Sequence, residues 1–91
     1  MRTIRFTARF HKDYKRALKS FPSLQSELQP VIDMLSADAQ LPIKNHDHPL
    51  KGEWVGFRDC HIRPDLVLIY RKFEPQMMEL SRLGSHSELS L

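Results

Sequence analysis

The sequence predicts a single α+β domain in which an N-terminal strand and a helical hairpin pack on an antiparallel sheet, in the order β-α-α-β-β-β. Apolar residues recur at the helical period through residues 10–35, and they alternate or run continuously between turn residues in residues 53–83. The 91 residues suffice for one hydrophobic core, so we expect residues 1–91 to form one domain.

The first strand and the first helix are predicted in the N-terminal quarter of the chain. Residues 3–6 alternate between apolar and polar side chains, as expected of a short strand. Apolar side chains of residues 10–21 then fall at i, i+4, i+7, i+8 and i+11, which places them on one face of an amphipathic helix. Pro22 ends this helix, because the residue before a proline is disfavoured in the helical region.

The second helix begins at Ser23, a favourable N-cap, and carries apolar side chains on one face as far as Leu35. Pro30 lies inside it and removes one backbone hydrogen bond. The cost is about 3 kcal/mol unless the helix kinks or restarts, so we expect a bend over residues 25–29. The short link 21–23 predicts that the two helices form an antiparallel hairpin.

Three strands are predicted after a polar loop of residues 37–45. Residues 53–62 alternate and predict a strand with a bulge or bend at Gly56. Residues 66–73 form the most apolar strand, and residues 77–83 form the last one. Tight turns between the strands predict an antiparallel meander, on which the helices pack.

The composition favours a cytoplasmic protein without a membrane segment. The sequence contains no apolar run of the about 20 residues that span a membrane, and no apolar segment follows the N-terminal arginines as in a secretory signal. Cys60 is the single cysteine, so no internal disulfide is expected.

Positive charge is concentrated near the N-terminus. Residues 1–21 carry seven basic side chains and one acidic one, whereas the rest of the chain carries seven basic and ten acidic ones. Such a segment favours a phosphate-backbone partner, although a solvated helix face rich in lysine explains it at least as well. The predicted RNA-binding surface consists of Arg9, Lys12, Lys15, Arg16 and Lys19.

Histidines near turns and strand ends are the main candidates for chemistry. His48 is expected in the loop before the first later strand, His61 near the end of that strand, and His86 after the last strand. Imidazole titrates near neutral pH, so these groups, beside Asp65 and Arg82, can supply a general acid, a general base and a stabilising cation. RNA cleavage through its own 2′-hydroxyl requires this set. Surface or capping histidines are the alternative, and composition alone favours them.

Other candidate sites have weaker support. A metal site would draw on the loop histidines, but their i, i+2 spacing lies outside the common zinc patterns. Its ligands would be His46, Asp47, His48 and His61. We expect neither a metal nor another cofactor. Cys60 lies on the opposite strand face from His61 and is predicted to pack in the core instead of acting as a nucleophile.

Aromatic and basic side chains of the later strands are candidate substrate contacts. Phe57, Tyr70 and Trp54 offer surface on which an RNA base can stack, although sheet packing is the simpler role for Trp54. We expect Arg58 and Tyr70 to join Arg82 in binding substrate.

Several motifs follow one another in the second half of the chain. They are DHPL over residues 47–50, GxWxGFRDCH over residues 52–61, where x is any residue, PDL and LIY within residues 64–70, and RLGSHSEL over residues 82–89. In order and spacing they resemble the YafQ-type branch of the RelE/ParE toxin superfamily, which has a RelE-like fold. The N-terminal half resembles this branch only in its helical-hairpin pattern.

The resemblance implies a toxin of a bacterial toxin–antitoxin pair, a ribosome-dependent endoribonuclease that cleaves translated mRNA and is neutralised by a cognate antitoxin. Its partners are then the antitoxin, mRNA in the ribosomal A site and ribosomal RNA. The implied catalytic set is His48, His61, Asp65 and His86, with Arg82 as phosphate ligand. Our hypothesis is that His86 protonates the leaving oxygen and that His61 or Asp65 helps to activate the 2′-hydroxyl.

The chain departs from the family pattern near its end. Ser90 and Leu91 follow the last histidine, where an aromatic residue is common, and Leu83 stands where a small hydroxyl residue is frequent. Two other functions remain open. The first is a ParE-like, non-nuclease toxin, which acts by binding a target such as DNA gyrase and has no need of the histidines. The second is an interaction domain whose basic surface only binds an acidic antitoxin segment.

Overall fold

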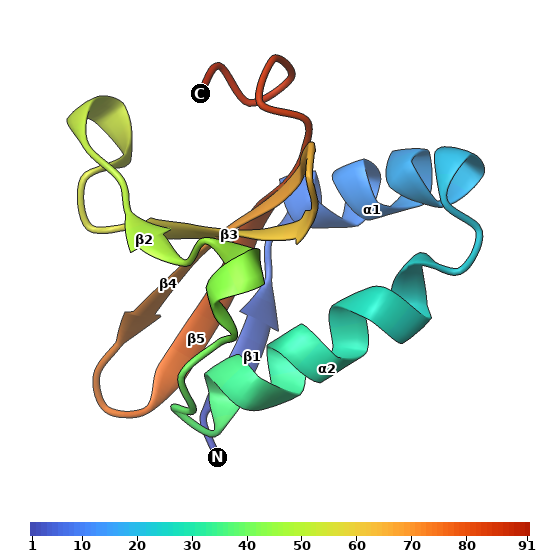
Figure 1. Cartoon of the computed structure of the whole chain (residues 1–91). Helices are drawn as coiled ribbons and strands as arrows, with labels where there is room; N and C mark the ends of the chain where they lie inside the picture. Colours follow the sequence, from blue (N-terminus) through green and yellow to red (C-terminus); the bar gives the residue numbers. More distant parts are fainter.

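The computed structural model describes residues 1–91 and confirms the α+β fold. Two helices lie on one face of a five-stranded sheet with the strand order β1-β5-β4-β3-β2 (Figure 1). The strands are β1 (Thr3–Phe6), β2 (His48–Pro49), β3 (Arg58–Arg63), β4 (Leu66–Phe73) and β5 (Met77–Gly84). The helices are α1 (Ala8–Ser20) and α2 (Leu24–Ser36), and two 3₁₀ turns are η1 (Ile43–Asn45) and η2 (Gly52–Trp54). Neither helix has the length and the apolar character needed to cross a membrane.

The sheet is mixed: the predicted antiparallel meander is confirmed, and β1, for which no direction was predicted, adds a parallel strand at its edge. The pairs β2–β3, β3–β4 and β4–β5 are antiparallel, whereas β1 pairs in parallel with β5. Tight turns fix the direction of the meander strands. The chain from β1 to β5 instead passes through both helices and three strands, so no local signal sets the direction of β1.

Both helices form close to their predicted positions. The Thr7 side chain caps α1 by accepting a hydrogen bond of 3.0 Å from the backbone N–H of Phe10. Ser23 is the N-cap of α2 but makes no capping hydrogen bond through its side chain, and the helix continues without interruption through Pro30. The chain reverses between the helices, which diverge from their connection so that both pack on the sheet (Figure 1).

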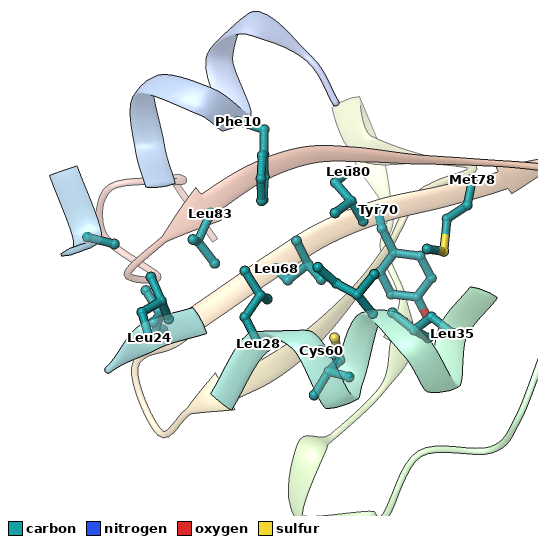
Figure 2. Packing of buried hydrophobic residues seen from close by; sticks show 14 of the residues in the cluster. Phe10, Leu24, Leu28, Leu35, Cys60, Leu68, Tyr70, Met78, Leu80 and Leu83 are labelled. Atoms are coloured by element: carbon teal, nitrogen blue, oxygen red, sulfur yellow. The ribbon is translucent and has the colours of Figure 1, made fainter. Parts of the chain in front are cut away.

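The main hydrophobic core lies between the helices and the sheet (Figure 2). It joins Phe10 of α1 and Leu24, Leu28 and Leu35 of α2 to the strand residues Cys60, Leu68, Tyr70, Met78, Leu80 and Leu83. Each fully buried leucine stabilises the fold by roughly 1.5–3 kcal/mol. Cys60 is fully buried, and burial raises the pKa of its thiol far above the usual range, so its predicted core position is confirmed.

A smaller core lies on the opposite face of the sheet. Val67 and Ile69 of β4 contact Leu89 of the C-terminal segment, with Leu50, Trp54 and Phe57 packed around them. The Trp54 and Phe57 rings meet edge to face at 5.1 Å, so Trp54 contributes to packing on this face of the sheet. The segment after β5 therefore folds back over the sheet face that the helices leave open.

The prediction of a strand over residues 53–62 is wrong in its first half. Residues 52–54 form η2, and β3 begins only at Arg58. Gly52 and Gly56 have φ values of 65° and 91°, which turn the chain twice before the strand starts. His48, expected in a loop, lies in β2 and pairs with Asp59 of β3.

A β-bulge in β5 directs the side chain of Arg82. Ile69 pairs with Arg82, whereas the next residue of β4, Tyr70, pairs with Leu80, which leaves Ser81 as the extra residue. Without this bulge, Leu80 and Leu83 would face opposite sides of the sheet. With it, both leucines join the main core, and Arg82 faces a groove that also contains His48 and His86.

Candidate active site

His86 and Asp65 form the most closely connected pair among the predicted site residues. Asp65 lies in the turn between β3 and β4, and its Oδ1 lies 2.6 Å from Nδ1 of His86. The same oxygen accepts a hydrogen bond of 3.0 Å from the backbone N–H of His86. These hydrogen bonds lower the pKa of Asp65. Because a carboxylate only accepts, Nδ1 of His86 carries a proton and Nε2 is left for a ligand.

His61 lies beside His86, so the structure brings together two of the predicted catalytic histidines. The two ring centroids are 5.0 Å apart, and the ring centroid of His46 lies 5.1 Å from that of His61. Burial lowers the pKa of His61, and the neighbouring histidines lower it further against the opposing effect of Asp59. A neutral His61 at pH 7 can accept a proton.

His48 reaches the site from β2. Its Nδ1 lies 2.6 Å from the backbone carbonyl of His46, which only accepts, so this nitrogen carries the proton and Nε2 is free. Asp59 lies beneath it, with Oδ1 3.2 Å from the same Nδ1. Asp59 is 2% exposed, and this oxygen has no hydrogen-bond partner in the protein.

Asp59 is a site residue that the sequence analysis did not assign. Burial raises its pKa, and protonation of His48, His61 or His86 opposes this effect. Side chains alternate between the two faces of a strand, so Asp59 and His61 lie on the same face. This shared face was the signal in the sequence that Asp59 belongs to the site. A buried carboxylate here stabilises positive charge on the surrounding imidazoles.

An open groove of about 750 Å³ contains His48, Asp59 and His86, whereas His61 lines a separate groove with His46. We call the first of these the histidine groove. It is lined by Arg9, His48, Leu50, Lys51, Glu53, Trp54, Asp59, Arg82, His86, Glu88, Leu89, Ser90 and Leu91. Apolar contacts are therefore available at Trp54 and Leu91, next to imidazole and guanidinium groups. Such a surface suits a substrate that is both anionic and partly aromatic, as a nucleotide is.

Arg82 lines the histidine groove but is tied to a partner on α1. Its Nε donates to Oδ2 of Asp13 at 2.7 Å, and Nη2 lies 3.4 Å from Oδ1. The backbone N–H of Leu83 donates to the same carboxylate at 3.0 Å. Burial alone raises the pKa of Asp13, but these hydrogen bonds and the charges of Arg82 and Arg16 outweigh it and lower the pKa.

Asp13 is a further residue of this site for which no role was predicted. Its position in the sequence indicates burial. Asp13 is three residues after Phe10 and four before Ala17, so it lies on the same, buried side of the helix as these two residues. An acid at such a position requires a partner from another element.

The expectation that Tyr70 binds substrate is wrong. Tyr70 is 1% exposed, and its hydroxyl donates to Oδ1 of Asp47 at 2.6 Å. Burial raises its pKa, and the hydrogen bond to Asp47 adds to this effect. Arg58 donates to the same oxygen at 3.2 Å and stays partly exposed in a second groove with His46 and His48. Arg58 thus remains accessible to a ligand.

The five predicted RNA-binding residues of α1 are all exposed, but they do not form one uniform surface. Arg9 lines the histidine groove. Arg16 forms ion pairs with Asp13 at 3.1 Å and with Glu88 at 3.3 Å. Lys12, Lys15 and Lys19 make no ion pair within the protein and stay available to an external anion.

The possible metal ligands do not form a metal site. No group of three or more histidine, cysteine or acidic side chains is arranged to hold a metal ion.

Fold and groove together define a class: a small α+β protein whose site offers imidazole and guanidinium groups to an anionic substrate. The family model described as the bacterial toxin of type II toxin–antitoxin systems, YafQ, matches residues 2–91. The chain belongs to this family of YafQ toxins. The resemblance read from residues 47–89 is thereby confirmed.

Related proteins match over nearly their full length. The mRNA interferase toxin YafQ of Escherichia coli strain K12 is 33% identical over 88 residues, which cover 97% of this chain and 95% of the relative. A metal-bound toxin from Helicobacter pylori is 41% identical with a TM-score of 0.90, covering 98% of this chain and 99% of that one. YafQ in the E. coli DinJ–YafQ complex is 33% identical with a TM-score of 0.84, and the match covers 98% of both chains.

Proposed function

We propose that this protein is a ribosome-dependent endoribonuclease that cleaves translated mRNA and thereby inhibits translation. The observation that carries the proposal is the presence of His48, Arg82 and His86 in the histidine groove, with the ring centroid of His61 5.0 Å from that of His86. The name of the E. coli relative, an mRNA interferase, supports the same activity.

Cleavage proceeds by attack of the 2′-oxygen on the adjacent phosphorus. The new P–O2′ bond replaces the P–O5′ bond, so the products are a 2′,3′-cyclic phosphate and a 5′-hydroxyl. A base removes the proton of the 2′-hydroxyl, and an acid protonates the departing 5′-oxygen. The phosphate gains negative charge on the way, which a fixed cation stabilises.

The geometry suggests a role for each group. His61, with its lowered pKa, is neutral near pH 7 and acts as the base. His86, oriented by Asp65 through Nδ1–H, acts in its imidazolium form and delivers the proton of Nε2 to the leaving oxygen. Arg82 contacts the phosphate. His48 lies above Asp59 and provides a second titratable group at the same phosphate.

This reaction needs no metal, and we assign the whole proton transfer to side chains. Asp65 touches no reacting atom in this mechanism. It acts by holding His86 and is therefore a positioning residue. Arg58, at the neighbouring groove, supplies a further contact to the RNA backbone.

The exposed lysines of α1 serve a different partner. Lys12, Lys15 and Lys19 present positive charge outside the histidine groove and bind ribosomal RNA when the toxin enters the decoding site of a cytoplasmic ribosome. A cognate antitoxin neutralises the toxin, as supported by the solved complex of E. coli YafQ with DinJ.

The proposal is tested by mapping mRNA 5′ ends in cells that express the wild type or His86→Ala. Cuts phased with the reading frame in the wild type, and absent in the variant, support the nuclease. Growth arrest by both proteins without new mRNA ends would contradict it and indicate a toxin that acts by binding, for example to DNA gyrase.

A further inference from the structure

Asp13 is unusually enclosed for a carboxylate on an amphipathic surface helix. The residue is 3% exposed, and its two oxygens receive donors from three residues: Arg82, Leu83 and Arg16. A buried ion pair of this kind adds little net stability, since apolar residues of similar volume serve as well. Its benefit lies in the geometry that it imposes on its partner.

The partner is the guanidinium of Arg82. Asp13 engages Nε and Nη2, so the plane of the guanidinium is fixed at two points. Nη1 makes no hydrogen bond within the protein, and Arg82 lines the groove that contains His48 and His86. Asp13 thus leaves Nη1 as the donor that a ligand in the groove can use.

The same carboxylate is connected to the segment that carries His86. Arg16 bridges Asp13 and Glu88, through contacts of 3.1 Å and 3.3 Å. Glu88 in turn accepts a hydrogen bond of 2.8 Å from the backbone N–H of Ser85, the residue before His86. Helix α1 therefore braces both the arginine and the turn of the last histidine.

We propose that Asp13 is a positioning residue, which holds Arg82 so that the free edge of its guanidinium binds the scissile phosphate. The inference rests on the proposed nuclease function. Asp13 touches no reacting atom and acts through Arg82. Misplacement of a phosphate contact by an ångström lowers the rate on the order of 10- to 100-fold, which is the expected effect of losing this carboxylate.

A double-mutant cycle tests the proposal. The variants are Asp13→Asn, Arg82→Ala and the double variant, and the rate of mRNA cleavage is measured in a translation extract. Asp13→Asn should lower the maximal rate on the order of 10- to 100-fold in the presence of Arg82 and cause no further loss in the Arg82→Ala background. An equal loss in both backgrounds overturns the proposal, because Asp13 would then act independently of Arg82.

Asp33→Asn is the matched control. Asp33 is an exposed aspartate of α2 that accepts a hydrogen bond from Gln29, so its replacement tests the loss of a helix carboxylate away from the groove. If Asp13→Asn does not fold, Asp13→Glu takes its place. The longer side chain keeps the charge but displaces the guanidinium, so the same pattern of losses is expected.

A second readout does not depend on RNA cleavage. Inorganic phosphate is titrated into the protein while the arginine Nε–H signals are followed by NMR. Phosphate should shift the Arg82 signal in the wild type and bind at least several-fold more weakly to Asp13→Asn, with thermal unfolding recorded in parallel. Unchanged phosphate affinity in the folded variant overturns the proposal. Absence of cleavage by the wild type refutes the nuclease function alone, and the phosphate titration then decides on Asp13.

Discussion

Asp65 holds His86 at two points, since one carboxylate oxygen accepts both the backbone N–H, at 3.0 Å, and the ring Nδ1–H, at 2.6 Å. The two residues are 21 positions apart and come from different turns at the same end of the sheet. This contact fixes the ring of His86 while its other nitrogen stays free.

Removing either member of this pair should lower cleavage to a different extent. His86→Ala removes the proposed acid and should reduce the maximal rate by about 10²–10⁴-fold. Asp65→Asn keeps an oxygen for the hydrogen bonds and loses only the charge, so a smaller loss, about 10-fold, is expected. Initial rates in a translation extract measure both effects. A larger loss for Asp65→Asn than for His86→Ala would contradict the assignment of Asp65 as a positioning residue.

The lowered pKa of His61 makes the stability of the fold depend on pH. The unfolded chain has the ordinary histidine pKa of about 6.5, so between that value and the lower folded value the unfolded state binds more protons. The contribution of neutral His61 to the free energy of unfolding is fully present above about pH 6.5. It is lost as the pH falls from this value through the pKa of His61 in the folded protein. Urea unfolding at pH 7 and pH 5 should show a smaller loss of stability for His61→Gln than for the wild type. Equal losses would argue against the shift.

Metal removal should leave the activity unchanged. Toxin treated with a chelator and then desalted should cleave mRNA at the rate of untreated toxin, because the proposed proton transfers use side chains alone. The comparison matters because a related toxin from Helicobacter pylori is metal-bound. Activity that disappears on chelation and returns with one particular ion would refute the metal-free mechanism.

Tyr70→Phe should affect stability more than activity. The substitution removes the hydrogen bond to Asp47, which is charged, and should lower the free energy of unfolding by about 1–3 kcal/mol. Urea denaturation measures this change, and Tyr14→Phe, which removes a hydroxyl without a hydrogen bond to the protein, is the control. Strong loss of cleavage by folded Tyr70→Phe would restore Tyr70 as a substrate contact.

The helices and the central strand were predictable, because burial on one face requires apolar residues at a regular spacing in the sequence. The faces of α1 and α2 and the apolar run of β4 follow directly from contact with one core. The direction of β1 was not predictable, because it depends on a pairing with β5 across more than 70 residues. The late start of β3 was missed because the turns at Gly52 and Gly56 interrupt an alternation that continues in the sequence.

The candidate site was partly predictable. Histidine chemistry singled out His61 and His86, and the structure places their rings 5.0 Å apart. Asp59 and Asp13 were not predicted, because the face on which each lies indicates burial but does not identify the partners that surround the carboxylate. The orientation of Arg82 depends on a bulge at Ser81, which alternation alone does not reveal.

The parallel pairing of β1 with β5 has a consequence for the synthesis of the protein. Strand β1 pairs only with β5, which follows the helices and the other strands in the chain, so β1 stays unpaired while these elements are made. Closing a contact between such distant segments is slow compared with forming the helices. The edge of the sheet and the segment bearing His86, which follows β5, are therefore completed only after the helices and the other strands have been made.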